Sequence, residues 1–231
     1  MTLGYDNWRP NQGTLLDLPF REGTGTITRD WAKPYHDPAT LVGTPTWSAL
    51  VAHDQIVLDF TPGNPDRIVI AAAASTDLNF TGGAFSGAVW IYPDAYGNRY
   101  LMMKGAAETG WSFWLSSASP YLVFTTEQAG PTYQSGDGGA GLVLSAWQFV
   151  GFSRSGASGR IYLNGIDRTA TAATHVNPAT AAAGDFYIGT TVGGGAGFYD
   201  GFMWRPRIWG RALAAWEFKA LYEAERSLFG V

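Results

Sequence analysis

The strongest constraint on the fold is the stretch from Trp147 to Gly165, whose sequence is WQFVGFSRSGASGRIYLNG. Two runs rich in aromatic and β-branched residues, 147–153 and 160–164, flank a cluster of Ser, Gly and Ala, and this arrangement predicts a β-hairpin. Asn164-Gly165 can supply the positive φ angles of a second tight turn, so the chain is expected to reverse again. Three strands joined by short turns imply an antiparallel sheet.

This stretch resembles the signature hairpin of the laminin-G-like branch of the concanavalin A-like lectin/glucanase superfamily. That hairpin has a Trp, a short hydrophobic strand, a polar turn and a strand ending in Asn-Gly. Other segments resemble the family in the same order: an opening strand at 16–25, the strand with the central Trp at 85–93, and closing strands with a helix at 186–222. The resemblance covers residues 13–224. It implies an all-β, two-sheet antiparallel jelly-roll sandwich with a short C-terminal helix.

Length and composition agree with one domain of this kind. The chain has 231 residues, 46% of them hydrophobic, which is enough to bury a large core. Its 30 glycines and 12 prolines are spread between short apolar runs, as expected of many strands and turns. We predict a single domain over residues 13–231, preceded by an N-terminal arm over residues 1–12 that contains Trp8.

Charge and targeting signals restrict the partners and the location. The formal net charge of −4 argues against nucleic acid or an anionic membrane as the main partner, because both require a basic surface. The N-terminal residues lack the basic start and apolar core of a secretion signal, although laminin-G-like domains mostly act outside cells. A virion protein, made in the cytoplasm and working outside, would reconcile these features. A fragment of a longer exported protein would also do so.

Apolar alternation predicts the remaining elements. Strands are expected near residues 15–20, 55–60, 67–74, 85–92, 100–104, 111–116 and 121–125, and loops at 21–48, 127–141 and 170–184. The predicted helix spans Leu213–Glu225 and has Ala214 where the family often has a Ser or Thr N-cap. That weakens its start by about 1 kcal/mol unless another residue compensates. Four tryptophans in apolar strands are predicted to lie in the core: Trp47, Trp90, Trp147 and Trp209.

Signals for catalysis are weak. Retaining glucanases of the superfamily carry a Glu-x-Asp-x-x-Glu strand that sets two carboxyl groups side by side, and this chain lacks that pattern. Its 3 histidines lie in dissimilar segments, and no G-x-S-x-G elbow is present. The cluster Gly193-Gly194-Gly195 lacks the Lys-Ser/Thr of a phosphate loop and is predicted to be a flexible turn. We therefore expect a protein that is not an enzyme, with glycoside hydrolysis as a less favoured alternative.

Calcium is the one cofactor that the resemblance suggests. Many relatives carry an Asp in the last long strand that helps to bind a structural calcium ion, and Trp204 stands at the matching position here. Asp66 and Asp200, both in predicted turns, are the remaining candidates for a calcium site. The alternative, which we favour, is that both are solvated turn aspartates, because Asp is common in turns.

The candidate ligand-binding residues surround a tryptophan. In the strand 111–116, one parity is apolar, whereas Trp114 lies between two serines and is predicted to form an exposed platform for a sugar ring. The alternative is that a loop or the second sheet covers it. Four residues of nearby loops could complete a carbohydrate site with Trp114: Tyr133, Asp137, Tyr96 and Asn98.

Two functions remain open at this point. The first is a non-catalytic carbohydrate-recognition module, virion-associated, whose partner is a surface glycan or polysaccharide. The second is a structural protein that decorates a phage capsid or tail and contacts other virion proteins; a self-associating arm around Trp8 would favour it. The C-terminal sequence RSLFGV resembles the tails of laminin-G-like proteins encoded among phage structural genes.

Overall fold

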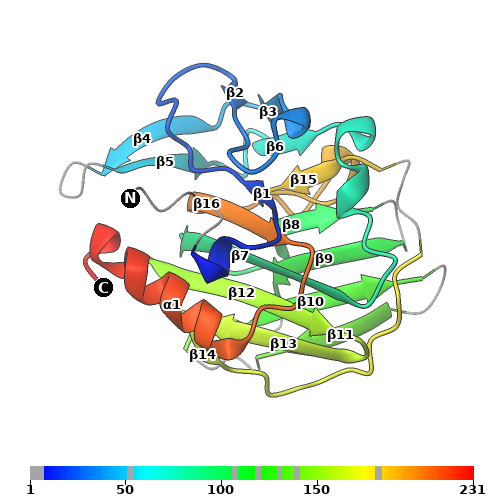
Figure 1. Cartoon of the computed structure of the whole chain (residues 1–231). Helices are drawn as coiled ribbons and strands as arrows, with labels where there is room; N and C mark the ends of the chain where they lie inside the picture. Colours follow the sequence, from blue (N-terminus) through cyan, green and yellow to red (C-terminus); the bar gives the residue numbers. More distant parts are fainter. Residues whose placement is uncertain are drawn as a thin grey trace.

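The computed structural model describes residues 8–50, 55–105, 109–117, 121–128, 132–137, 141–179 and 184–231. These residues form two antiparallel sheets of eight strands each, packed face to face, with one α-helix against the outside of the first sheet (Figure 1). The all-β sandwich with a short C-terminal helix that the sequence predicts is therefore confirmed. In the described part of the chain, no helix combines the length and apolar character needed to cross a bilayer.

The first sheet has the order β14-β13-β12-β7-β16-β5-β4, with β1 paired to β16. Its strands are β1 (Thr14–Asp17), β4 (Thr46–Leu50), β5 (Gln55–Phe60), β7 (Ala84–Pro93), β12 (Gln148–Ser155), β13 (Ser158–Leu163), β14 (Ile166–Asp167) and β16 (Gly201–Trp209). The helix α1 (Ala215–Glu225) and the 3-10 turn η7 (Arg226–Phe229) cover its outer face.

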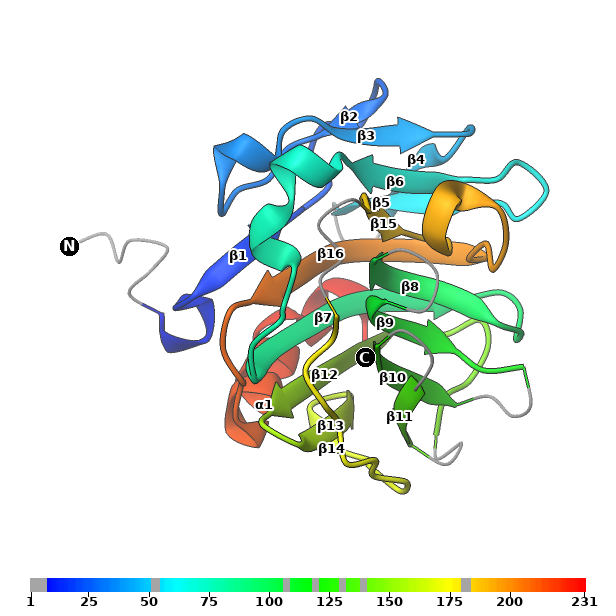
Figure 2. The same cartoon turned by 90° about the vertical axis from the view of Figure 1, so that its right-hand side faces the viewer.

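The second sheet has the order β11-β10-β9-β8-β15-β6-β3-β2. Its strands are β2 (Ile27–Thr28), β3 (Ala39–Val42), β6 (Arg67–Ile70), β8 (Arg99–Lys104), β9 (Gly110–Leu115), β10 (Leu122–Glu127), β11 (Thr132–Gly136) and β15 (Phe186–Ile188). The described part of the chain has five further 3-10 turns: η2 (Arg9–Asn11), η3 (Pro34–His36), η4 (Ala72–Ala74), η5 (Thr76–Leu78) and η6 (Val192–Gly194). Figure 2 shows β8 to β11 beside β7 and β12 of the first sheet.

Aromatic side chains fill the space between the sheets. Phe124 of the second sheet stacks on Phe152 of the first with ring centroids 4.4 Å apart, and Phe85 of β7 contacts both of them. Burial of this apolar surface is the main force that holds the two sheets together. Strand β7 is buried on both faces, as its sequence predicts, because Trp90 on the opposite side packs under α1 against Tyr222.

The glutamate at the end of α1 joins the helix to the first sheet. Glu225 is 4% exposed and accepts hydrogen bonds from Trp90 Nε1 at 2.8 Å, from Arg205 at 2.9 Å and from Arg207 at 2.7 Å. Arg207 is fully buried, and its guanidinium lies near the rings of Phe149 and Trp209. Glu225 is the only ion-pair partner of Arg207 among the described residues.

The predicted hairpin is confirmed: β12 and β13 pair from Val150–Leu163 to Ser155–Ser158, and β14 pairs with β13. The loop predictions were partly wrong. Residues 21–48 contain β2, β3 and most of β4, and residues 127–141 contain β11. These strands are short and partly polar, so pairing within the sheet decides their structure more than local pattern does. The strand expected over 67–74 ends at Ile70 and continues into η4.

The helix begins at Ala215, two residues after the predicted start. Its missing N-cap is compensated by Glu217, whose Oε2 accepts the Ala214 N–H at 2.9 Å. Glu217 also binds both terminal nitrogens of Arg211. This bond is the half of a capping box that the N3 residue supplies, and it fixes the start of the helix.

The core prediction is confirmed for Trp90 and Trp209, whereas Trp47 and Trp147 are only partly buried and pack against the edge of the core. Of the predicted arm, residues 1–7 lie outside the described residues. Trp209 Nε1 donates to the Pro10 carbonyl at 2.7 Å, and Arg211 binds the carbonyls of Arg9 and Gln12. These bonds hold η2 beside the start of α1.

Replacement of Glu225 by Gln should destabilise the protein by about 3 kcal/mol, because it leaves the buried Arg207 without a counter-charge. The measurement is urea unfolding at neutral pH, followed by tryptophan fluorescence. Glu223→Gln is the matched control: Glu223 is on the same helix but exposed, paired with Lys219 and Arg226, and its replacement should leave the midpoint unchanged. Equal midpoints for both variants would contradict the role assigned to Glu225.

Candidate functional site

Trp114 lies on the outer face of the second sheet. In β9, Trp111, Phe113 and Leu115 are buried in the core, whereas Trp114 has the opposite parity and is partly exposed. Its ring stacks on Tyr100, the cross-strand partner on β8, at 5.6 Å and an interplanar angle of 11°. Its Nε1 donates to Thr125 Oγ1 at 3.0 Å. Trp114 is therefore half-buried and fixed. This lies between the two alternatives left open by the sequence, an exposed platform and a covered side chain.

A hollow of about 330 Å³ opens beside this ring. We call it the Trp114 hollow; its walls are Trp114, Tyr121, Val123, Gln134, Ser135, Gly136 and Thr171. Gln134 is exposed, and its amide forms no hydrogen bond within the described part of the chain. An aromatic wall with a few free polar groups suits a sugar ring, whose faces are apolar and whose edges carry hydroxyl groups.

The predicted site residues are only partly gathered around Trp114. Asn98 lies two residues before Tyr100, and its Oδ1 accepts the Ser117 N–H at 2.9 Å, just beyond the end of β9. Tyr96 is 39% exposed, but its hydroxyl donates to the Leu142 carbonyl at 3.4 Å, so it leans away from β9.

The two residues from the long glycine-rich loop fall in or beside β11. Asp137 is fully buried and its Oδ1 accepts the Leu122 N–H at 3.0 Å, so it joins β10 to the end of β11 instead of facing solvent. Tyr133 pairs with Thr126 in the ladder between β10 and β11. The side chain of Tyr133 lies outside the described residues.

Sequence reasoning missed Tyr100, Tyr121, Gln134 and Thr171. Tyr100 is next to Trp114 only because Tyr100 and Trp114 are opposite each other in the β8–β9 ladder, and a register shift between Tyr100 and Met102 sets that pairing. Gln134 lies on β11, in a polar, glycine-rich stretch whose sequence predicts a loop. Thr171 reaches the hollow through an isolated bridge to Gly136. Only the register of the sheet, which no local signal provides, brings these residues together.

The candidate calcium ligands have different surroundings. Asp66 is 1% exposed, and its two oxygens accept the N–H groups of Thr44 at 2.6 Å and Thr61 at 2.8 Å. The prediction of a solvated turn aspartate was therefore wrong for Asp66, because its buried carboxylate binds the backbone N–H groups of two turns. Trp204, at the family's Asp position, is buried against Phe229, so that position offers no oxygen ligand.

Asp200 lies in an acidic neighbourhood. Burial and the nearby carboxylates of Asp94, Asp66 and Asp200 raise the pKa of Asp59, and burial with Asp200 raises the pKa of Asp94. Among the described residues, however, no three His, Asp or Glu side chains are grouped closely enough to hold a metal ion. A calcium site at Asp200 stays a prediction.

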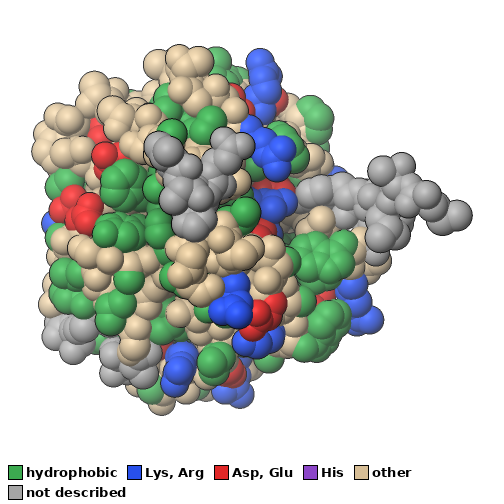
Figure 3. Space-filling view, turned by 90° about the vertical axis from the view of Figure 1, so that its left-hand side faces the viewer, with side chains coloured by type: hydrophobic (Ala, Val, Ile, Leu, Met, Phe, Trp, Pro, Cys, Tyr) green, Lys and Arg blue, Asp and Glu red, His purple; other side chains and the backbone are tan. Residues whose placement is uncertain are grey.

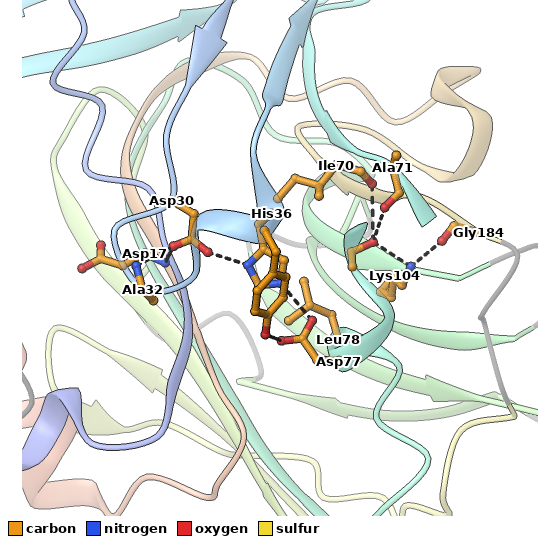
Figure 4. Close-up of polar contacts among 12 residues, drawn as sticks. Asp17, Asp30, Ala32, His36, Ile70, Ala71, Asp77, Leu78, Lys104 and Gly184 are labelled. Carbon is orange, nitrogen blue, oxygen red and sulfur yellow. Dashed lines mark hydrogen bonds and ion pairs between the residues drawn. The ribbon is translucent and has the colours of Figure 1, made fainter. Parts of the chain in front are cut away.

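A second group of polar side chains has the composition of a catalytic site (Figure 4). His36 Nδ1 lies 2.5 Å from Asp30 Oδ2, His36 Nε2 lies 2.9 Å from Asp77 Oδ1, and Tyr35 donates to Asp77 at 2.7 Å. Burial alone would lower the pKa of His36, but the hydrogen bonds to Asp30 and Asp77 raise it to about 9. Both ring nitrogens are thus engaged by carboxylates, and the group joins η3 to η5 rather than activating a nucleophile.

Lys104 lies close to this group (Figure 4). Its ammonium donates to Ser75 Oγ at 2.9 Å and to the Gly184 carbonyl at 2.5 Å, and burial lowers its pKa to about 8. Ser75 and Lys104 are both fully buried. A substrate therefore has no route to this pair, whose role is to hold the end of β8 against the turn at Ser75.

His175 supports the Trp114 hollow from inside. Its Nδ1 is 2.8 Å from Thr126 Oγ1 and its Nε2 is 2.7 Å from Ser135 Oγ. Burial, with Arg154 nearby, lowers the pKa of His175 to about 4. The neutral imidazole thereby ties the segment 168–179, which carries Thr171, to β10 and β11.

The face drawn in Figure 3 is mixed in character. Among the described residues, its Lys and Arg side chains lie next to Asp, Glu and hydrophobic side chains and do not form one continuous basic patch. Nucleic-acid binding requires a clustered basic surface. This face therefore offers no support for it.

The sequence of residues 70–217, more than half of the chain, matches a laminin-G-type family described as the concanavalin A-like lectin/glucanases superfamily. The chain belongs to this superfamily. No curated protein sequence matches the chain. The family assignment agrees with the observed sandwich and does not by itself choose among the ligands of the superfamily.

Solved structures of this superfamily fold resemble the chain at low identity. Domain 4 of the GH43 extracellular arabinanase AbnA from Geobacillus stearothermophilus, solved with arabinotriose, has a TM-score of 0.67 at 14% identity over 90% of this chain and 98% of that one. The receptor-binding domain of botulinum neurotoxin type G has a TM-score of 0.65 at 14% identity, over 92% of this chain and 51% of that one. The chain thus spans about half the length of the neurotoxin domain. At this identity, both likenesses show the fold alone.

The two buried histidines contribute to stability with opposite pH dependence on the two sides of pH 6.5. The pKa of His36 is raised to about 9, so its contribution is complete below pH 6.5 and is lost as the pH rises to 9. The pKa of His175 is lowered to about 4, so its contribution is complete above pH 6.5 and is lost as the pH falls to 4. We expect His36→Gln to flatten only the alkaline decline, and His175→Gln only the acid decline. Urea midpoints measured from pH 4.5 to 9.5 check this, and unaltered slopes would contradict it.

Proposed function

We propose that this chain is a non-catalytic carbohydrate-recognition module that binds a surface glycan or polysaccharide at the Trp114 hollow. The observation that carries the proposal is a fixed aromatic ring, stacked on Tyr100, which forms one wall of a hollow where the Gln134 amide is free. Such a ring loses little conformational entropy on binding and presents an apolar face to a sugar. The glycoside hydrolase alternative lacks a carboxylate pair beside this ring among the described residues that line the hollow.

The binding expected from this geometry is shallow and weak for one site. A hollow of about 330 Å³ lies at the small end of ligand sites. Repeated presentation on a particle would multiply such an affinity through avidity. This requirement suits the virion setting expected from the RSLFGV terminus, which is part of the proposal. The structural relative solved with arabinotriose supports recognition of carbohydrate in general.

A second candidate function is protein contact in a virion. Trp8 and Trp216 are 38% and 51% exposed, and the Arg9 guanidinium lies 5.3 Å from the Trp216 ring centroid. Exposed aromatic side chains beside an arginine are typical of protein interfaces. If this surface associates, Trp216→Ala should lower the molecular mass measured by light scattering at high protein concentration. A wild-type protein that stays monomeric would exclude self-association through it.

Replacement of Trp114 by Ala should weaken glycan binding by roughly 30-fold, about 2 kcal/mol, because it removes the central aromatic contact. The measurement is a glycan array that includes bacterial surface polysaccharides and arabino-oligosaccharides, followed by titration of the best ligand. Trp216→Ala is the matched control: it removes an exposed tryptophan on α1, which covers the first sheet, and should bind as the wild type does. Thermal unfolding establishes that both variants are folded.

Absence of any array binding by folded, multivalent wild-type protein would contradict the proposal and favour the virion contact role. The array is run once with calcium and once with a chelator. Loss of binding in the chelator would support a calcium ion near Asp200, and Asp200→Asn should then reproduce that loss with calcium present. Equal binding in both conditions would remove calcium from the mechanism.

A further inference from the structure

The outer face of the second sheet carries another hollow, of about 410 Å³. We call it the Arg67 hollow. Its apolar floor and its polar walls come from four segments: Pro38, Thr40, Val42, Arg67, Val69, Ala71, Asp185, Tyr187 and Gly193. A concave, largely apolar surface with a few fixed polar groups is the usual form of a small-ligand site.

The arginine of this hollow is held in place before any ligand arrives. Arg67 Nη1 donates to the Pro65 carbonyl at 2.8 Å. The guanidinium also packs directly on Gly194, where an added Cβ would lie 2.5 Å from Nε. Gly194 has a φ of +66°, and Gly193 before it has +71°, so the glycine cluster at 193–195 forms a tight turn against Arg67. The Nη2 group is left without a partner among the described residues.

The acidic side of the hollow is equally fixed. Asp185 Oδ1 accepts the Ala72 N–H at 2.8 Å, and Oδ2 accepts the Tyr187 hydroxyl at 3.3 Å. Tyr187 lines the hollow beside Gly193, Arg67 and Asp185. The carboxylate keeps lone pairs that can accept further hydrogen bonds.

Arg67 and Asp185 face the same hollow but form no ion pair with each other. Separate backbone contacts hold each in place: the Pro65 carbonyl holds Arg67, and the Ala72 N–H holds Asp185. A neutral sugar unit fits the gap, because its hydroxyl groups both donate, to Asp185, and accept, from Arg67. An acidic sugar would gain from Arg67 but be repelled by Asp185.

The Arg67 hollow and the Trp114 hollow share one face. Tyr187 pairs with Met103, and Met103 with Ser112, two residues before Trp114 on β9. The hollows centre on β6 and β10, which are separated by β15, β8 and β9 (Figure 2). Four strand spacings of roughly 4.8 Å put the centres about 19 Å apart. Met103 and Ser112 between them are buried, so the hollows are distinct and not one groove.

We infer that the Arg67 hollow is a second sugar subsite, which takes a neutral unit of the same polysaccharide chain that occupies the Trp114 hollow. The inference rests on the proposed function and extends it: the ligand is a neutral polysaccharide engaged at two points along its length. Two weak contacts on one chain give an affinity well above either contact alone. Short oligosaccharides reach only one hollow and lack this gain.

The test is isothermal titration with arabino-oligosaccharides from the disaccharide to the octasaccharide, and with polygalacturonate oligomers of matched length. The variants are Arg67→Met, which keeps the aliphatic stem but removes the donors, and Thr40→Phe, which fills the hollow from β3. Arg160→Met is the control: Arg160 is half-exposed, on β13 of the first sheet. Thermal unfolding verifies the fold of each variant.

We expect the wild type to bind the arabino-octasaccharide on the order of 10- to 100-fold more tightly than the disaccharide. Arg67→Met and Thr40→Phe should abolish this difference and leave disaccharide binding intact, whereas Arg160→Met should match the wild type. Wild-type octasaccharide affinity in both hollow variants would overturn the second subsite and leave the proposed function standing. Tighter binding of the acidic oligomers would overturn the neutral ligand. Failure of the wild type to bind any oligomer would overturn this inference, and failure on the glycan array would overturn the proposed function with it.

Discussion

The buried carboxylate of Glu225 is the interaction on which the arrangement of the first sheet and its helix depends. It receives hydrogen bonds from Trp90 on β7 and from Arg205 and Arg207 on β16. An arginine as buried as Arg207 would be strongly destabilising without a counter-charge. The helix is therefore fixed over the two central strands by charge and geometry as well as by apolar contact. The helix covers part of this face, and both proposed sugar hollows lie on the outer face of the second sheet.

Buried histidines fix the loops around that second sheet. His36, between two carboxylates, joins η3 to η5, and neutral His175 ties the segment 168–179 to β10 and β11. Carboxylate or hydroxyl groups beside a histidine, as found at both positions, also occur in the catalytic sites of enzymes. Here, both ring nitrogens of each are occupied by groups that hold loops in place. The carboxylate neighbours of His36 favour its protonated form. The burial of His175, with hydroxyl neighbours and a nearby arginine, favours its neutral form.

The proposed binding face follows from these constraints. Trp114 stands on a rigid sheet, with its indole N–H bound to Thr125, and Arg67 is clamped by a glycine turn. Weak sugar binding benefits from such fixed groups, since little entropy is lost when the ligand arrives. With two separate hollows on one face, a long polysaccharide chain would make two weak contacts at once and bind more tightly than through one. The superfamily fold supports many ligands, so the function depends on these side chains and not on the sandwich itself.

The sequence by itself determined the fold class through its resemblance to the family. Local alternation and turn chemistry determined the hairpin 148–163, the burial of Trp90 and the outward parity of Trp114. The sequence did not determine β2, β3 and β11, because these strands are short and partly polar and carry little apolar alternation. Tertiary structure alone decided that Tyr100 and Gln134 join Trp114, that Asp137 is buried, and that Arg67 faces Asp185 across a hollow. These contacts depend on sheet register, and register is fixed by packing of the whole sandwich, which no local segment contains.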